Sequence, residues 1–418
     1  MGGLGRAAYG TKVQYSSVRV GHILEPRHYA FRACRVESCP GSAWPCAPTQ
    51  SRHGAALASL HGGRKENQSW KRLSRRSPVP VDGLACRMIR FTKTVYLDAK
   101  GHSMRQPKIV IVGAGLVGGS AALFAAVTIP SAELVLIDVA RARAEGQAMD
   151  LAHAAAFWGD NRFHAGDYDD ARDADVVVIT AGVGVKPGQT RLDLARINAD
   201  ITTEIVDRIA PLAPLAIYII ASNPCDVLAG VVLDRLRCAK ERVISTGTSL
   251  DTGRLRSLLS DRLSVVPTAI HAYVLGEHGE SALIHWSGAA VCGMPLELFL
   301  SRSGKELGAA SRDLILRSVH EAAKLIKEGK GATHYGIASA IGRICQAIVH
   351  NTDLILTVGI VHAEVEGVPH VCLSLPMVIN VSGAHLLAYP ELSSVEREAL
   401  RCSAQIVKEA TDSLLLAR

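Results

Sequence analysis

The chain has 418 residues, 48% of them hydrophobic, which predicts two or three folded domains and excludes a disordered chain. Its net charge of +7 is uneven, because residues 1–103 carry 17 basic and 5 acidic side chains and the remainder has a net charge of −5. The remainder lacks the basic surface that nucleic-acid binding requires. It also has no apolar run of the ~20 residues that a membrane helix needs. We therefore expect neither a nucleic-acid nor a membrane partner.

The ten cysteines are scattered, without CxxC pairs or the spacing of metal ligands. They predict reduced, mostly buried thiols in a cytoplasmic protein and no metal site. Residues 1–103 are rich in Arg, Ser, Gly and His and show neither strand nor helix periodicity, so no fold is assigned to them. This segment fits a reading frame that begins too far upstream, a disordered extension or a targeting segment, and we favour the first. Met104 and Met88 are alternative starts.

From Lys108 onward, buried strands alternate with helices. Strands are predicted where apolar runs end at Gly, Pro or polar residues, at 108–112, 133–138, 175–180, 215–222 and 242–245. Helices are expected between them, at 120–127, 140–153 and 192–209. This alternation predicts an α/β fold, with a Rossmann-type parallel sheet in residues 104–247.

Beyond Thr246 the pattern indicates an α+β catalytic domain in residues 248–418. Helices are predicted at 251–259 and 312–328, and a hairpin at 359–365 and 368–376. A C-terminal helix at 394–416 begins with a capping box of Ser393 and Glu396. Its expected apolar stripe consists of Val395, Ala399, Cys402, Ile406 and Ala410.

A glycine-rich turn, Gly113-x-Gly115-x-x-Gly118, follows the first strand and opens a helix. The first glycine permits the turn, the second lets a pyrophosphate approach the backbone, and the third lets helix and strand pack closely. Such turns also occur for packing alone. Asp138 ends the second strand, where an acid hydrogen-bonds a ribose 2′-OH and repels a 2′-phosphate. The pattern predicts NAD rather than NADP as the cofactor.

His278 lies between two glycines in Gly276-Glu277-His278-Gly279, and Asp251 and Arg254 lie one helical turn apart. An Asp that accepts the ring N–H of a His fixes its tautomer and favours the imidazolium, which can protonate a carbonyl oxygen. The guanidinium of Arg254 offers a bidentate fit to a substrate carboxylate. The alternatives are a structural His and an ordinary Asp–Arg pair. Together the residues predict chemistry on a 2-oxo or 2-hydroxy acid.

A loop with three glycines and one proline, residues 182–191, follows the third strand, at the edge where open α/β sheets bind ligands. Its composition suits a mobile lid. Arg191 at its end could swing in and polarise the substrate carbonyl. Asn223, in Ser222-Asn223-Pro224 after another strand, could donate a hydrogen bond to the same oxygen.

The chain resembles the L-lactate/malate dehydrogenase family over about three quarters of its length, nearest to the bacterial lactate branch. Six motifs carry the resemblance: Gly113–Gly118, Lys186–Leu194, Ser222–Pro224, Gly247–Arg254, Gly276–Gly279 and Gly331–Gly336. The resemblance implies an NAD-dependent oxidoreductase acting on CH–OH. It makes His278 the proton donor and acceptor, Asp251 its partner, Arg254 the carboxylate clamp, and Arg191 and Asn223 the residues at the carbonyl. The cofactor residues it implies are Gly113, Gly115, Val117, Gly118, Asp138, Asn223 and Ile337.

Val185 and Thr333 bear on the substrate. Malate enzymes of the family carry an Arg at the position of Val185, and lactate enzymes usually a Gln. An apolar residue cannot pair the second carboxylate of oxaloacetate, so malate is disfavoured. Thr333, in Gly331-Ala332-Thr333, is similar to the residue that the lactate branch of the family has at this position. L-lactate and pyruvate are the preferred substrates, with larger apolar 2-hydroxy acids and malate as alternatives. A non-catalytic NAD-binding protein is the alternative from another class.

The resemblance also bears on regulation and assembly. Arg256 and His271 match the positions where bacterial lactate enzymes of the family bind fructose 1,6-bisphosphate, and ordinary interface residues are the alternative. The resemblance also implies a homotetramer that takes part in glycolysis or fermentation in the cytoplasm.

Overall fold

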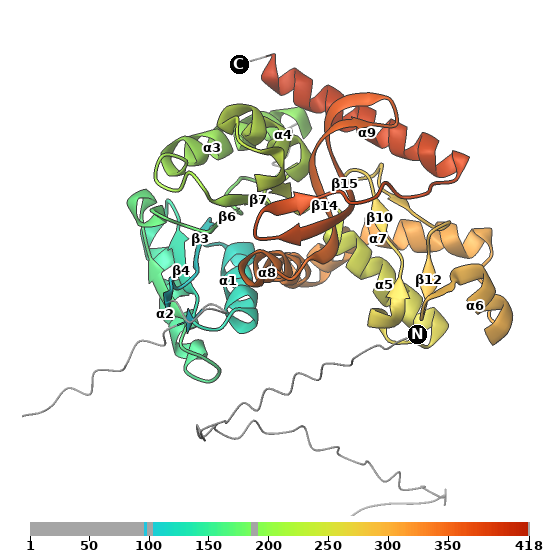
Figure 1. Cartoon of the computed structure of the whole chain (residues 1–418), viewed down its shortest axis with the longest axis horizontal. Coiled ribbons are helices and arrows are strands. Elements are labelled where there is room, and N and C mark those ends of the chain that lie inside the picture. The colour runs from blue at the N-terminus through green and yellow to red at the C-terminus, as the bar shows by residue number, and fades with distance from the viewer. Residues whose placement is uncertain (1–95, 98–102, 185–190, 417–418) are drawn as a thin grey trace, which may run out of the picture. The chain divides into compact units, whose positions relative to one another are not determined.

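The computed structural model describes residues 96–97, 103–184 and 191–416 (Figure 1). In this part of the chain the largest sheet has nine strands, in the order β16-β15-β14-β8-β7-β6-β3-β4-β5. Its parallel strands are β3 (Lys108–Val112), β4 (Glu133–Ile137), β5 (Arg162–Ala165), β6 (Val176–Ile179), β7 (Ile217–Ile220) and β8 (Val243–Ser245). The predicted parallel sheet is confirmed, and β5 is an additional strand.

The sheet continues beyond β8 with antiparallel strands β14 (Leu354–Val365), β15 (Val368–Asn380) and β16 (Gly383–His385). The predicted hairpin is therefore confirmed, but it joins the parallel strands, because Gly359 of β14 pairs with Ser245 of β8. Shorter strands are β1 (Tyr96–Leu97), β2 (Ser103–Met104), β9 (Ile270–His271), β10 (Val274–Leu275), β11 (Leu283–Ile284), β12 (Ala290–Val291) and β13 (Met294–Pro295). Strand β1 and Ser103 of β2 fall in residues 1–103, to which no fold was assigned, and Met104 of β2 is the first residue of the predicted Rossmann domain.

Helices cover the sheet, and in the second half of the chain they also pack against the short strands. They are α1 (Leu116–Thr128), α2 (Arg141–Ala155), α3 (Arg191–Ile209), α4 (Cys225–Leu236), α5 (Ser249–Leu263), α6 (Leu296–Ser303), α7 (Ala309–Lys330), α8 (Tyr335–His350) and α9 (Ser394–Leu415). Short 3-10 turns lie at η1 (Tyr168–Ala171), η2 (Lys240–Arg242) and η3 (Pro267–Ala269). Helices α4, α6 and α8 were not predicted, although the buried residues of α8, among them Ala338, Ile341, Cys345 and Ile348, recur at helical spacing.

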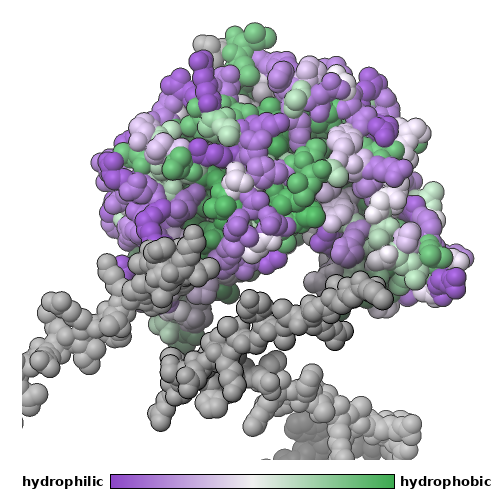
Figure 2. All heavy atoms as spheres, in the orientation of Figure 1, coloured by the Kyte–Doolittle hydropathy of each residue, from purple (hydrophilic) through white to green (hydrophobic). Residues whose placement is uncertain are grey.

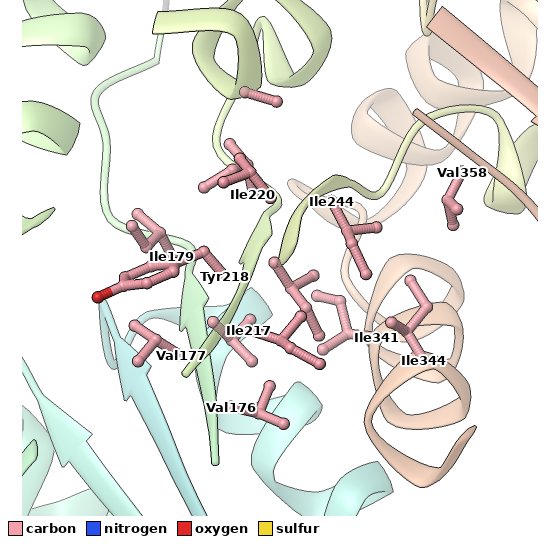
Figure 3. Close-up of a cluster of buried hydrophobic side chains, with 14 of the residues drawn as sticks. Val176, Val177, Ile179, Ile217, Tyr218, Ile220, Ile244, Ile341, Ile344 and Val358 are labelled. Atoms are coloured by element: carbon pink, nitrogen blue, oxygen red, sulfur yellow. The ribbon is translucent and has the colours of Figure 1, made fainter. Parts of the chain in front are cut away.

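The main core lies between the sheet and its helices. The strand β3 is buried over four of its five residues, as expected of a strand covered on both faces. Helix α8 packs against α1 and α5, and Figure 3 shows its Ile341 and Ile344 beside Ile217 and Ile244 of the sheet. A second core joins α5, α6 and α7 with the short strands, around residues such as Leu255, Ile270, Leu296, Ile315 and Val319.

Helix α9 corrects one prediction. Its capping box is present, with Glu396 N–H donating to Ser393 Oγ and Ser393 N–H to Glu396 Oε2. The apolar stripe was wrong, because Val395 is 77% exposed and Ile406 48% exposed. The buried face, which packs against α4 and β15, instead consists of Glu396, Leu400, Ser403, Ala404, Val407, Thr411 and Leu414.

Apolar side chains also reach the surface, and Figure 2 shows them among polar ones on one face of the molecule. The most exposed large ones include Val139, Phe157, Leu215, Leu387 and Val395. Within the described residues, no helix is both long and apolar enough to cross a membrane. The same residues contain no group of three or more His, Cys, Asp or Glu side chains suited to hold a metal ion.

Candidate active site

A cavity of about 320 Å³ is lined by four of the predicted site residues, which come from three parts of the chain. Asn223 follows β7, Asp251 and Arg254 lie on α5, and His278 lies in the loop after β10. The residues that line the cavity are Leu194, Asn223, Pro224, Asp251, Arg254, Glu277, His278, Gly279, Glu280, His320 and Ala323. The cavity therefore gives one small guest access to an imidazole, a guanidinium and an amide.

The imidazole of His278 is held by Asp251, because its Nδ1 lies 2.6 Å from Oδ2 of that carboxylate. Since Nδ1 is engaged, Nε2 is the ring nitrogen that can reach a guest. Burial alone would lower the pKa of His278, but the hydrogen bond and the charge of Asp251 outweigh it and raise the pKa above its ordinary value. The site thus favours the protonated imidazole that reduction of a carbonyl group needs.

Asp251 is buried and shared between two cations. Arg254 Nη1 donates to its Oδ1 at 2.8 Å, while His278 occupies its Oδ2. Burial would raise the pKa of Asp251, but the hydrogen bond and charge of His278, together with Arg254, lower it. Among the described residues, the buried Nε of Arg254 has no hydrogen-bond partner. An unpaired guanidinium N–H beside the cavity fits a carboxylate as the guest.

Asn223 and the start of the predicted lid are tied together by Asn198 of α3. The amide of Asn198 accepts the N–H of Val183 at 2.8 Å and donates to the carbonyl of Asn223 at 2.7 Å. This buried amide fixes the loop that leads into residues 185–190, which lie outside the described residues. Val185, for which a role in substrate choice was predicted, therefore lies outside the described residues. Arg191 begins α3, but its side chain is also outside the described part.

The glycine turn between β3 and α1 has the geometry that a dinucleotide needs. Gly113 has a φ of +102°, which disfavours a side chain, and a Cβ at Gly118 would lie 1.8 Å from the carbonyl oxygen of Gly113. By contrast, a Cβ at Gly115 would meet no described atom within 4 Å. Gly115 is the N-cap of α1 and has no side chain over the helix N–H groups. The open backbone at Gly115 therefore fits a pyrophosphate at the helix N terminus.

Asp138 lies at the end of β4 beside this turn. Its carboxylate accepts the N–H groups of Ala114 and Ala140, both at 2.8 Å, and lies 3.5 Å from Nη1 of Arg143. Asp138 thus orders the glycine turn, a role that was not predicted. Each carboxylate oxygen can accept a further hydrogen bond, so a ribose hydroxyl still fits.

Thr333 and Ile337 lie where α7 gives way to α8, outside the lining of the cavity. Ile337 of α8 and Val117 of α1 both pack against the main core. The two helices are joined by Ser120 Oγ, which lies 2.9 Å from Nδ1 of His334. Helices α1 and α8 therefore belong to one packed unit, which includes the glycine turn at the start of α1.

Arg256 and His271 lie on neighbouring elements. Arg256 Nε donates to the carbonyl of Ala272 at 3.3 Å, and its guanidinium lies 5.1 Å from the ring centroid of Tyr273. Arg256 and Arg343 both line a second cavity of about 350 Å³. His271 is exposed and is not in that lining.

Several cavity residues were not predicted. His320 and Ala323 lie about one turn apart on α7, within the helix predicted at 312–328. Their shared helix face was the signal in the sequence that could have identified them. Glu277 and Glu280 flank His278 in the same motif. Asp226, which accepts the backbone N–H of His278 at 2.7 Å, has no motif of its own beyond following Asn223-Pro224.

Two family models match the chain. The model described as lactate/malate dehydrogenase, NAD binding domain, matches residues 107–245. The model described as lactate/malate dehydrogenase, alpha/beta C-terminal domain, matches residues 248–415. The chain belongs to the lactate/malate dehydrogenase family. This confirms the predicted family, and with it an oxidoreductase with NAD as its cofactor.

Relatives of this dehydrogenase agree in sequence and in structure. It is 43% identical to the L-lactate dehydrogenase of Geotalea daltonii and 41% identical to that of Thermus aquaticus, each over 73% of this chain and 99% of the relative. The solved structure of MGS-M5, a lactate dehydrogenase from a Medee basin deep-sea metagenome library, aligns with a TM-score of 0.70 at 40% identity, over 74% of this chain and 99% of that one. The minor L-lactate dehydrogenase of Enterococcus mundtii aligns with a TM-score of 0.69 at 34% identity, over 74% and 98%. The predicted α/β fold class is confirmed.

Proposed function

We propose that the chain is an NAD-dependent L-lactate dehydrogenase that interconverts pyruvate and L-lactate. The observation that carries this proposal is the arrangement of His278, Asp251 and Arg254 around one small cavity. It is supported by the relatives, which are named L-lactate dehydrogenases. Residues 104–247 would bind the cofactor, and residues 248–418 would supply most of the substrate site.

The residues of the cavity have separate tasks in this reaction. Arg254, which lines the cavity, binds the carboxylate of pyruvate through its guanidinium group and so orients the carbonyl group toward His278. His278, protonated and held through Nδ1, donates its Nε2 proton to the carbonyl oxygen and becomes neutral. Asn223 and Arg191 stabilise charge on that oxygen. In the oxidation of lactate, neutral His278 takes the proton back.

When bound, NADH supplies the hydride that reaches C2 of pyruvate. Gly113, Gly115, Val117 and Gly118 would hold its pyrophosphate at the N terminus of α1. Asp138 would accept a ribose hydroxyl and repel a 2′-phosphate, which favours NAD over NADP. Ile337 and Asn223 would contact the nicotinamide side of the cofactor.

The substrate proposal rests on Val185 and Thr333. A valine cannot pair a second carboxylate, so oxaloacetate is disfavoured, while larger apolar 2-oxo acids stay alternatives. Initial rates with pyruvate, oxaloacetate and 2-oxoisocaproate test the choice, with pyruvate expected to be fastest. A Val185→Arg variant should gain oxaloacetate turnover at the expense of pyruvate, and Val185→Ile is the matched control that adds bulk without charge. Unchanged relative rates in Val185→Arg would mean that Val185 does not meet the substrate.

Turnover itself is tested by His278→Asn. This variant should bind NADH with parental affinity and lose nearly all pyruvate reduction, by a factor of about 10²–10⁴. Reduction at the parental rate would remove the proposed role of His278. A wild-type protein that binds NADH but consumes none with any of the three oxo acids would instead be the non-catalytic NAD-binding protein.

Regulation and assembly are proposed on the same basis. Arg256 and His271 would bind fructose 1,6-bisphosphate, and the proximity of Arg256 to Arg343 supports an anion site. Fructose 1,6-bisphosphate should lower the pyruvate concentration at half-saturation, and Arg256→Gln should abolish that response.

The exposed apolar side chains of Met149, Phe157 and Trp158 support assembly into a homotetramer, which sedimentation can test. The enzyme would then serve cytoplasmic glycolysis and fermentation.

A further inference from the structure

Asp226 is a buried carboxylate directly behind the proposed active site. It lies in the first turn of α4 and is 2% exposed. Ser245 Oγ, at the end of β8, donates to its Oδ1 at 2.6 Å, and the backbone N–H of His278 donates to its Oδ2 at 2.7 Å. Asp226 therefore joins the parallel sheet to the loop that carries His278.

The charge of Asp226 is not balanced by a Lys or Arg side chain in the described part of the chain, and the cation that acts on it is the imidazolium of His278. Both hydrogen-bond donors are neutral, and in the described part of the chain no ion pair joins Asp226 to a Lys or Arg. The surrounding backbone is tight as well, because a Cβ at Gly359 of β14 would lie 2.9 Å from Asp226 Oδ1. A buried carboxylate that makes no ion pair with Lys or Arg is costly, and an apolar or amide side chain would fill this place at lower cost. Its presence at this place points to a task for the charge.

We propose that Asp226 is a positioning residue for the proton transfer: it fixes the peptide group of His278 and supplies a second negative charge, besides that of Asp251, that stabilises the imidazolium. The inference deepens the proposed function and rests on it, because it assigns how His278 keeps its proton. Asp226 does not itself line the cavity, so it acts only through His278.

The charges that face these two groups come from several elements. His278 has Asp251 and Arg254 on α5, Asp226 on α4, Glu277 and Glu280 in its own loop, and His320 on α7. Asp226 has His278 and Glu277 in the loop, with the thiols of Cys225 on α4 and Cys372 on β15 nearby. Of these, Asp251 and Asp226 both act to raise the pKa of His278, against burial and the charge of Arg254, which lower it.

The charge of Asp226 is available at neutral pH. Burial raises the pKa of Asp226 to about 6, although the hydrogen bonds from His278 and Ser245 act in the opposite direction. Asp226 is therefore ionised above this value and neutral in mild acid.

Asp226→Asn separates the charge from the hydrogen bonds. The amide oxygen can still accept the N–H of His278, and the NH₂ group can donate to Ser245 Oγ, which rotates to accept. In the pH profile of kcat/KM for pyruvate reduction, the midpoint at which activity falls with rising pH should move down by roughly 1 unit. NADH affinity, measured by fluorescence, should stay at the parental value. Ser245→Ala is the matched control, because it removes a hydrogen bond to Asp226 but keeps the carboxylate. Loss of that bond raises the pKa of Asp226, so the carboxylate is still charged above a somewhat higher pH, and the midpoint should move less than in Asp226→Asn.

The outcomes are distinct. An unmoved midpoint in Asp226→Asn, whatever the rate, would overturn the proposal and leave Asp226 a structural residue, and so would an equal shift in Ser245→Ala. A second measurement needs no variant at this site: the ring resonances of His278, identified by their loss in His278→Asn, should show an inflection near the pKa of Asp226, about 6. Its absence would also overturn the proposal. If the wild type reduces no oxo acid, the proposed function falls, while the resonances still test the coupling of Asp226 to His278.

Discussion

Nδ1 of His278 and Oδ2 of Asp251 lie 2.6 Å apart, although they are 27 residues apart in the sequence and come from different elements. The same carboxylate binds Arg254 through its other oxygen. One buried acid therefore sets both the protonation of the imidazole and the position of the guanidinium. A change at Asp251 should for this reason affect proton transfer and substrate binding together.

Asp251→Asn should lower kcat/KM for pyruvate reduction by about 10²–10⁴. The amide cannot stabilise the imidazolium, so the pKa of His278 falls, and the loss of activity with rising pH should occur at lower pH than in the wild type. A pH series of initial rates measures both effects. Glu398→Gln, which removes a carboxylate from the exposed ion pair with Arg401, is the control and should leave the profile unchanged. A parental profile in Asp251→Asn would contradict the assignment of Asp251 as the partner of His278.

Arg254→Lys should raise KM for pyruvate more than it lowers kcat. Lysine keeps the charge but loses the planar pair of N–H groups, and a hydrogen bond to a charged group contributes about 1.5–3 kcal/mol, or roughly 10- to 100-fold in KM. Steady-state kinetics separate the two parameters. The matched control is Arg235→Lys in the exposed ion pair with Asp207. Equal KM values in both variants would show that Arg254 does not bind the carboxylate.

The glycine turn offers a contrast between two substitutions. Gly118→Ala places a Cβ 1.8 Å from a backbone oxygen, so the turn must shift, and we expect the free energy of unfolding to fall by about 1–3 kcal/mol. Gly115→Ala has space for its Cβ in the protein alone, so its melting temperature should stay near the parental value. Its methyl group would occupy the place proposed for the pyrophosphate, and the Kd for NADH should rise about 10-fold or more, equivalent to about 1.4 kcal/mol. Parental NADH binding by Gly115→Ala would place the cofactor elsewhere.

Much of the site could be predicted because its residues follow strand ends. Asn223 lies in the loop that follows β7, and the glycine turn comes directly after β3, so the shared edge of a parallel sheet brings their loops together. Asp251 and Arg254 were recognisable because a single helical turn separates them. The pairing of His278 with Asp251 was predicted from chemistry, and the structure supplies its distance.

What the sequence could not reveal depends on long-range packing. Asp226 lies among apolar residues at the start of α4, and only the fold brings it under the backbone of His278. The face of α9 was assigned wrongly for a related reason. Its buried Ser403 accepts the N–H of Glu277 at 2.8 Å, so a hydroxyl group occupies a position that hydrophobic periodicity assigns to solvent.

Asp226 and Asp251 should have opposite effects on stability. The pKa of Asp226 is about 6 in the folded protein against an ordinary 3.8, so its stabilising contribution is present below 3.8 and is lost as the pH rises through about 6. This difference of about two pH units corresponds to about 3 kcal/mol at most, and Asp226→Asn should therefore melt at a higher temperature than the wild type at neutral pH.

The advantage of Asp226→Asn should grow between pH 3.8 and about 6 and stay level above it. Asp251 provides the matched comparison, because its pKa is lowered in the folded protein, and its contribution is present at neutral pH and lost in acid. Asp251→Asn should therefore melt at a lower temperature than the wild type at neutral pH, with the difference shrinking in acid. Thermal unfolding at several pH values and one protein concentration measures both. A destabilised Asp226→Asn at neutral pH would mean that its carboxylate stabilises the fold rather than the charge of His278.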